Sequence, residues 1–369
     1  MFFFWHTILQ NTGYFFKSLD KKIFLVYNVF SDRVADTCEA CDRGRTCGDS
    51  LYFLKELPMA KPFLSFEDQI DYLVNQKNLI ISNHEYALEK LMQIGYFSLV
   101  GGYKTPFKNT TTKKYCDGTT FENIVELYKL DENLRELFLK YILKIERHIR
   151  SLLSYYFTEK YGENQIHYLT PSNYNNTARN SSDIVKLIGM LDNLANTNSD
   201  YPYINHQRRA YGNVPLWVLV SGITFGSLSK FYSLVTPDLK VKVSKKFVNV
   251  NERQLEQYLS VITKFRNVCA HNERLYSYQT MNDIPNTAIH KKLGLPQTGT
   301  QYVCGKHDLF ALIISFKYLL TKSDFDKFKG SLSKILNHYL DSQNALEETV
   351  LYGYMGFPNN WKNISKYSK

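Results

Sequence analysis

The feature that most constrains this chain is a broad apolar stripe repeated at helical spacing. Within residues 131–157, "DENLRELFLKYILKIERHIRSLLSYYF", apolar side chains recur every three or four positions, which is the period of one face of an α-helix. The stripe consists of Leu134, Leu137, Phe138, Tyr141, Ile142, Ile145, Ile149, Leu152 and Leu153. It predicts a helix over 131–157, with Asp131 as its N-cap, packed in one core against a helix expected at 252–276.

The same period returns through most of the chain after residue 60. Further helices are expected at 65–81, 85–95, 182–195, 215–235, 251–276, 307–320 and 322–340. Ser65 and Asp68 match a capping box at the start of the first of these. Polar loops are expected at 108–120, 160–182 and 277–303. No segment alternates at strand period, and ten prolines and eighteen glycines are few for an all-β chain of 369 residues, so we predict an all-α fold.

Composition divides the chain near residue 58. In residues 1–58 seven basic and seven acidic side chains cancel, so the whole net charge of +10 lies in the remainder. Lys55-Glu56 can be encoded by a bacterial ribosome-binding sequence, which leads us to expect that translation starts at Met59. The predicted divisions are an atypical N-terminal extension at 1–58, an N-terminal helical subdomain at 59–125, a helical core at 126–345 and a C-terminal tail at 346–369.

The net charge and a pI of about 9.0 suit an anionic partner, of which nucleic acid is the commonest. A basic surface without a specific partner is the alternative, and a DNA-binding regulator has only the charge in its favour. No basic segment of a secretory signal opens the sequence, and no apolar run approaches the roughly 20 residues of a membrane-spanning helix. We expect a cytoplasmic protein that does not bind a membrane.

Motifs for metals and cofactors are weak or absent in the sequence. Cys38-x-x-Cys41 is followed by Cys47, but no second cysteine or histidine pair completes the four ligands of a zinc site. His84-Glu85 lacks the second histidine of the zinc-protease pattern, and no phosphate-binding glycine loop occurs. We therefore predict neither a metal nor a cofactor.

The segment "KFRNVCAHNERLY" places three polar side chains on an otherwise apolar helix. Arg266 and His271 are five positions apart, roughly 140° around a helix, so one helix does not aim both at one atom. Two copies of the helix related by a two-fold axis could aim these side chains at one shared cleft, with one Arg and one His from each copy. A guanidinium binds a phosphate with two donors, and a histidine moves a proton near neutral pH. Asn267 shares a face with His271. The plainer alternative is that these side chains bond helix ends or neighbouring carboxylates.

A second polar pair lies on the helix at 131–157. Glu146 and Arg150 are four residues apart, which suits a local ion pair. Glu146 also borders the apolar stripe, where a carboxylate needs a partner. The alternative is that Glu146 orients the Arg or His of the other helix, and the sequence leaves both interpretations open.

Six separated segments between Lys61 and Trp361 carry a more specific pattern. They are "KPFLSFEDQIDYL", "LMQIGYFSLVGGYKTPF", "IERHIRS", "PLWVLVSGITFGSLSKFY", "FRNVCAHNERLY" and "MGFPNNW". In this order they resemble the motifs of the Abi-like proteins of the AbiD/AbiF type, bacterial abortive-infection proteins directed at phage. Phe97 stands in the place of the second Tyr of the family's Ile-Gly-Tyr-Tyr segment.

The resemblance implies a HEPN-like helical bundle with an N-terminal helical subdomain. HEPN domains often act as metal-independent ribonucleases, so it implies RNA as substrate and Arg266 and His271 as the catalytic pair. Asn267 would be the polar residue beside the Arg, and Glu146 with Arg150 would form the family's other polar motif. We expect a homodimer that cleaves RNA by attack of the 2′-OH. The alternative is a HEPN-fold RNA-binding or regulatory module without cleavage activity, held with a noncoding RNA or a partner protein.

Overall fold

The structure is a computed structural model, and the chain divides into two compact units, residues 1–63 and 64–369. The described residues are 62–197, 199–342 and 346–369. The expectations for residues 1–58, including the start at Met59 and the Cys38 cluster, lie outside the described residues. The described residues from 64 onward belong to the second unit.

That unit is built almost entirely of helices, which confirms the predicted all-α class. The α-helices are α2 (Phe66–Asp71), α3 (His84–Ile94), α4 (Phe121–Tyr161), α5 (Ile166–Leu169), α6 (Ser181–Asn196), α7 (Pro202–Tyr211), α8 (Leu216–Leu219), α9 (Phe225–Leu234), α10 (Pro237–Ser244), α11 (Glu252–Ala270), α12 (Ala288–Lys292), α13 (Leu309–Leu319), α14 (Lys322–Asp341) and α15 (Glu348–Met355). The π-helical and 3-10 segments are Tyr72–Gln76, Phe97–Gly101, Thr105–Phe107, Pro171–Asn173, Val220–Gly222 and Trp361–Lys366. Strands β1 (Gln297–Thr298) and β2 (Gln301–Tyr302) form an antiparallel hairpin within the loop expected at 277–303.

Several predicted helix ends are confirmed. Ser65 caps α2, where its Oγ accepts a hydrogen bond from the backbone N–H of Asp68 at 3.1 Å and the Asp68 side chain completes a capping box. α3 ends at Gly95, which has φ 86°. Glycine adopts a positive φ without steric cost because it has no Cβ. At these two positions a short polar side chain and a glycine mark the helix ends that the sequence predicted.

The long helix α4 starts earlier than the sequence predicted. It begins at Phe121, and the Thr120 hydroxyl accepts a hydrogen bond from the N–H of Asn123 at 3.3 Å. The apolar period already runs through "FENIVELYKL", where Ile124 and Leu127 are buried. Asp131 is therefore not an N-cap but a fully buried residue inside the helix, and the expectation that it starts a helix is wrong.

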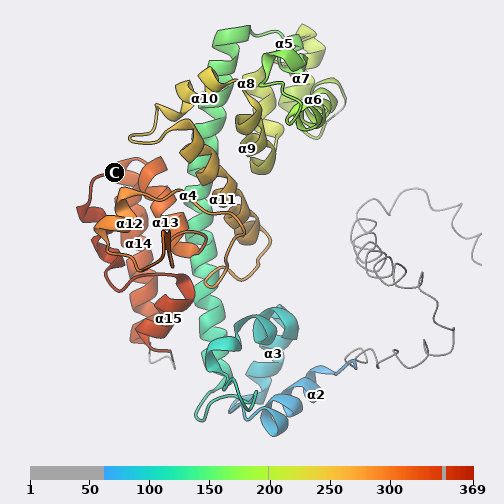
Figure 1. Cartoon of the computed structure of the whole chain (residues 1–369). Coiled ribbons are helices and arrows are strands. Elements are labelled where there is room, and N and C mark those ends of the chain that lie inside the picture. Colours follow the sequence, from blue (N-terminus) through green and yellow to red (C-terminus); the bar gives the residue numbers. More distant parts are fainter. Residues whose placement is uncertain (1–61, 198, 343–345) are drawn as a thin grey trace, which may run out of the picture. The chain divides into compact units, whose positions relative to one another are not determined.

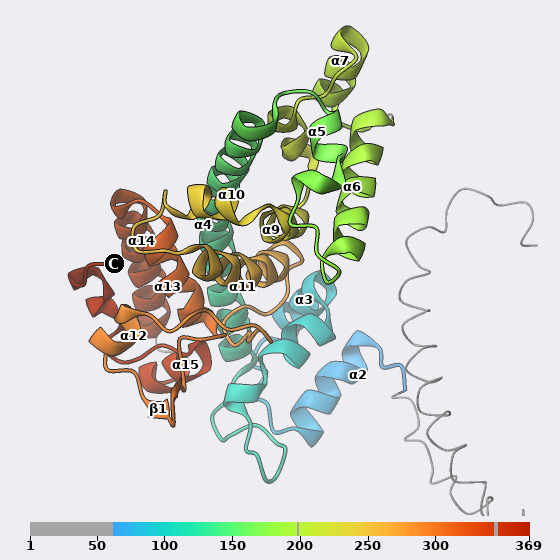
Figure 2. The same ribbon diagram turned by 45° about the horizontal axis from the view of Figure 1, so that its top comes forward.

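The other helices pack around α4 (Figures 1 and 2). The π-helical turn after α3 contacts it, α8 to α11 pack along it, and α14 packs on it as well. All residues of α13 are buried, as expected for a helix that is apolar all round. Phe138 and Tyr141 of α4 meet Phe316 of α13 and Phe328 of α14 in an aromatic cluster, which joins three helices into one core.

The single helix expected at 215–235 is two helices, α8 and α9. The chain leaves the helical path after Gly222, and Thr224 caps α9 by accepting a hydrogen bond from the N–H of Ser227 at 3.1 Å. The break frees the carbonyl oxygens of Ser221 and Ile223, and both accept hydrogen bonds from Arg150 of α4. A tertiary contact thus replaces helical hydrogen bonds at this point.

α4 runs through residue 125, where the sequence analysis divides 59–125 from 126–345. That division remains a prediction. Among the described residues no helix is both long and apolar enough to cross a membrane.

Candidate functional site

The site is organised by the way α11 ends. Asn251 opens the helix with a capping box, and the helix was expected to continue to residue 276 but stops at Ala270. His271 is the first residue past it, and its N–H still donates to the carbonyl of Asn267 at 2.9 Å. Asn272 follows with φ 56°, a left-handed conformation that Asn tolerates better than most residues. His271 therefore projects from a turn rather than from a helical face.

A buried carboxylate holds the chain that follows this turn. Asp131 accepts hydrogen bonds from the backbone N–H groups of Leu275 at 2.8 Å and Tyr276 at 2.6 Å. It also accepts from the hydroxyl of Tyr103 at 2.7 Å and from Arg135 at 2.9 Å. The two backbone hydrogen bonds hold residues 275 and 276 away from the helical path of α11. A carboxylate without exposed surface is stable here because four donors surround it.

Two segments far apart in the sequence form a cleft beside this carboxylate. Arg274 reaches across and donates to the carbonyl of Gly102 at 2.7 Å, and the rings of Tyr103 and Tyr276 stack with centroids 5.8 Å apart. The cleft has a volume of about 590 Å³. It is lined by Phe97, Ser98, Gly101, Gly102, Tyr103, His271, Asn272, Glu273, Arg274, Ser277, Tyr278 and Gln279.

Among the residues that the sequence placed at the catalytic centre, His271 is exposed in this cleft. Arg266 and Asn267 are not among its lining residues. Arg266 is half-buried, and its Nε is buried without a hydrogen-bond partner among the described residues. Asn267 is exposed on the outer face of α11. Within one chain, His271 and Arg266 therefore do not share a cleft.

Cys269 lies between these residues and suggests a different chemistry, a thiolate nucleophile beside a histidine. The side chain is buried, and burial raises the pKa of the thiol to about 12. The thiol is therefore protonated at neutral pH, and only a thiolate is an effective nucleophile. Cys269 serves as a small apolar side chain of the core.

Glu146 and Arg150 lie elsewhere on α4 and form the local ion pair that the sequence allowed. Arg150 also donates to the carbonyls of Ser221 at 3.2 Å and Ile223 at 2.6 Å. Both residues line a separate pocket of about 480 Å³ with the half-exposed Trp217. The alternative role of Glu146, orienting a side chain of α11, stays a prediction.

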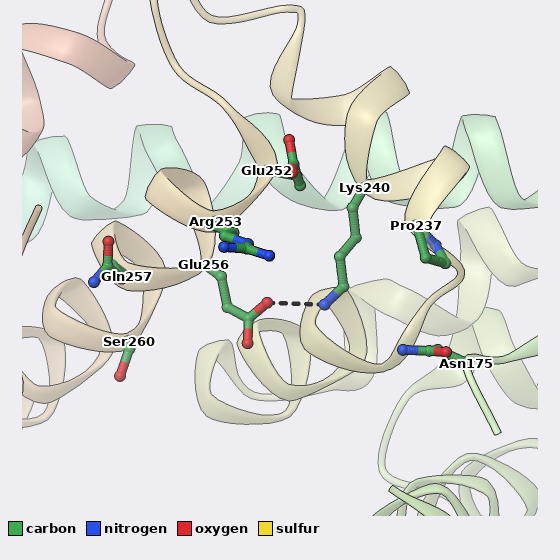
Figure 3. A pocket seen from close by; sticks show the side chains of 8 residues that line it. All are labelled: Asn175, Pro237, Lys240, Glu252, Arg253, Glu256, Gln257 and Ser260. Atoms are coloured by element: carbon green, nitrogen blue, oxygen red, sulfur yellow. Dashed lines mark hydrogen bonds and ion pairs between the residues drawn. The ribbon is translucent and has the colours of Figure 1, made fainter. Parts of the chain in front are cut away.

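A larger hollow of about 720 Å³ lies against α10 and the first turns of α11 (Figure 3). Within this hollow Lys240 and Glu256 form an ion pair, in which Nζ of Lys240 lies 2.8 Å from the carboxylate of Glu256. None of the residues selected from the sequence lines it. In the described part of the chain, no group of three or more His, Cys, Asp or Glu side chains is arranged to hold a metal ion.

Sequence analysis missed the carboxylate that shapes the cleft. A signal was present, because Asp131 lies between Leu130 and Leu134 in a helix whose neighbouring positions are apolar. A charged residue at a core position needs buried partners, and Arg135, one helical turn later, is one of them. The remaining partners, Tyr103 and the backbone after His271, come from segments that no local pattern connects to α4.

The sequence model of the Abi-like protein family matches residues 89–277, just over half of the chain. The matched region contains Asp131 and all the lining residues of the cleft except Tyr278 and Gln279. No curated protein and no solved structure matches the sequence. With more than half of its residues matched, including most of those that line the cleft, the chain belongs to the Abi-like protein family.

Proposed function

We propose that this protein acts in abortive infection as a metal-independent ribonuclease of the HEPN type. One observation carries the proposal. His271, the residue expected to move a proton, is exposed in a cleft whose two walls are family segments about 170 residues apart in the chain. The net charge of +10 suits a polyanionic substrate.

The proposed chemistry needs a proton carrier and a phosphate-binding cation. The 2′-oxygen of a ribose attacks the adjacent phosphorus while its proton passes to a base, and the bond from phosphorus to the 5′-oxygen breaks as that oxygen gains a proton. His271 carries one of these protons. Arg266 stabilises the charge on the phosphoryl oxygens through its planar pair of donors. The products are a 2′,3′-cyclic phosphate and a 5′-hydroxyl.

The placement of Arg266 supports a dimeric site. Its guanidinium has a buried Nε without a partner in the described residues and lies outside the cleft of its own chain. A two-fold axis near the end of α11 would bring Arg266 of one copy toward His271 of the other. In this arrangement neither chain cleaves RNA alone.

The test is RNA cleavage by purified protein with and without a chelator. His271→Ala and Arg266→Ala should each lose cleavage while keeping the helical circular dichroism of the wild type, because Ala favours helices. Arg266→Lys should recover little, since an ammonium lacks the planar fork. Matched controls are His338→Ala, an exposed histidine of α14, and Arg253→Ala, an exposed arginine at the other end of α11.

Cleavage that needs no metal, spares 2′-deoxy substrates and leaves cyclic phosphate ends would support the proposal. A folded His271→Ala protein that cleaves at the wild-type rate would overturn the assignment. In the second candidate, a non-catalytic RNA-binding module held with a noncoding RNA or partner protein, Arg266 stays outside the cleft of His271 in the assembled protein as it does in one chain. That candidate is correct if wild type and variant bind RNA alike and neither cleaves it.

A further inference from the structure

Phe97 occupies an unusual position in the cleft. Its side chain is 88% exposed, although it belongs to the π-helical turn Phe97–Gly101, in which the neighbouring Leu99 and Val100 are fully buried. The ring packs over Gly101, where an added Cβ would lie 3.5 Å from Phe97 Cδ2. The glycine thus lets the ring rest against backbone and leaves the rest of it to solvent. A single exposed aromatic ring is common on protein surfaces, so the meaning of Phe97 depends on the side chains that share its cleft.

The surroundings of Phe97 are polar. Exposed lining residues are Ser98, His271, Asn272, Glu273, Arg274 and Gln279, so the ring faces polar side chains, one of them acidic, rather than an extended apolar patch of the kind that binds another protein. Arg274 is anchored to a neutral carbonyl and forms no ion pair within the described residues. Its positive charge is therefore available to an anion, since a guanidinium binds phosphate well.

An isolated aromatic ring beside an unpaired guanidinium is the arrangement that binds single-stranded nucleic acid. Every base has a π-face that stacks on an aromatic side chain, and a cation nearby holds the backbone. The cleft volume of about 590 Å³ falls within the range of small-ligand sites and holds one nucleotide. Bases within a duplex are already stacked on their neighbours and do not reach such a ring.

We propose that the cleft is a binding subsite for one unpaired ribonucleotide, with the base stacked on Phe97 and its phosphate held by Arg274. The subsite selects single-stranded over double-stranded RNA and places the bound nucleotide beside His271. Its use in cleavage rests on the proposed function, whereas binding at the subsite does not. Phe97 is a binding residue in this account, and His271 remains the group that moves the proton.

The experiment measures binding separately from cleavage. A fluorescent oligonucleotide carrying 2′-O-methyl groups throughout has no free 2′-OH and cannot be cleaved, so anisotropy reports affinity alone. Stacking on one aromatic side chain is worth about 1–3 kcal/mol, so Phe97→Ala should weaken binding by roughly 5- to 150-fold. Phe97→Trp should restore it. The same sequence as a duplex should bind wild type and Phe97→Ala equally.

The matched control is Tyr211→Ala, because Tyr211 is a 68% exposed aromatic residue at the end of α7, outside the cleft. It should bind like the wild type. Arg274→Gln should bind more weakly and show a shallower dependence of affinity on salt, since one phosphate contact is lost. Circular dichroism and thermal unfolding of each variant confirm that the fold is intact.

Two results would overturn the subsite: Phe97→Ala that binds single strands as tightly as Tyr211→Ala, or Phe97→Ala that changes only the oligomeric state in sedimentation. The second result would identify the ring as a protein contact. The two proposals fail separately. Wild type that binds through Phe97 but never cleaves RNA refutes the ribonuclease alone, whereas cleavage with an unchanged KM in Phe97→Ala refutes the subsite alone.

Discussion

The carboxylate of Asp131 connects three parts of the chain that lie far apart in sequence. Its partners are the backbone at Leu275 and Tyr276, the hydroxyl of Tyr103, and Arg135 of its own helix. Since Tyr103 and residues 271–279 form opposite walls of the cleft, this one side chain sets the distance between them. The cleft therefore depends on a residue that does not line it.

Asp131→Ala should destabilise the protein strongly. It removes the acceptor of two backbone N–H groups and leaves the buried Arg135 without its carboxylate. Removing one partner of a buried ion pair typically lowers the unfolding free energy by about 3–5 kcal/mol. Urea unfolding followed by circular dichroism measures the loss. The matched control is Asp326→Ala, because Asp326 forms the same i, i+4 pair with the exposed Lys322. Equal losses in the two variants would show that the buried network contributes nothing special.

Among the structural elements, the short helix α12 depends on an uncharged histidine. Thr287 donates its backbone N–H to Nδ1 of His290 at 3.1 Å, so this nitrogen must accept and Nε2 must carry the proton. Nε2 lies 2.8 Å from the carbonyl of Gly305, and the ring stacks on Tyr302. Burial lowers the pKa of His290 to about 4. Protonation at Nδ1 would break the cap and place a charge in the core.

This geometry predicts a loss of stability in acid. Between about pH 6.5 and 4 the unfolded chain binds a proton at His290 that the folded chain does not, so the unfolding free energy falls by about 3 kcal/mol as pH drops through that window. His290→Asn keeps an acceptor for the cap but has nothing to titrate, so its stability should fall less over the same range. Urea unfolding from pH 7 to 4 compares the two.

The carboxyl group of Asp308 changes the unfolding free energy with pH in the direction opposite to His290. Burial raises the pKa of Asp308 to about 6, so its contribution is present in acid and is lost as pH rises toward 6. Asp308 is present in both the wild type and His290→Asn, so the difference between their slopes isolates the histidine. Parallel slopes in the two proteins would show that His290 titrates normally in the folded state.

At the scale of the whole molecule, the proposed site needs two copies. If Arg266 of one chain acts with His271 of the other, a mixture of Arg266→Ala and His271→Ala proteins contains dimers with one intact pair. Co-refolding or co-expressing the two inactive variants should then restore RNA cleavage that neither shows alone. Sedimentation should show dimers at the concentration of the assay. Inactivity of the mixture, with mixed dimers demonstrated by mass spectrometry, would place both residues of a site in one chain.

The sequence by itself determined the helices and many of their ends. Apolar periodicity identified α4, α13 and α14, and local signals marked Ser65 and Gly95 at helix ends. These properties depend on side chains within one or two helical turns, so neighbouring residues suffice to predict them. The motifs also indicated the family, which the match over residues 89–277 confirms.

Only the tertiary structure decided where helices break and which residues meet. The helix expected at 215–235 divides because Arg150 binds the freed carbonyls of Ser221 and Ile223. The helix expected to reach residue 276 stops at Ala270 because Asp131 binds the N–H groups beyond the turn. In both cases a charged side chain from a distant segment, half-buried in Arg150 and fully buried in Asp131, competes with the helix for backbone groups. No local pattern contains that partner, so His271 takes its place in the cleft only once the chain is folded.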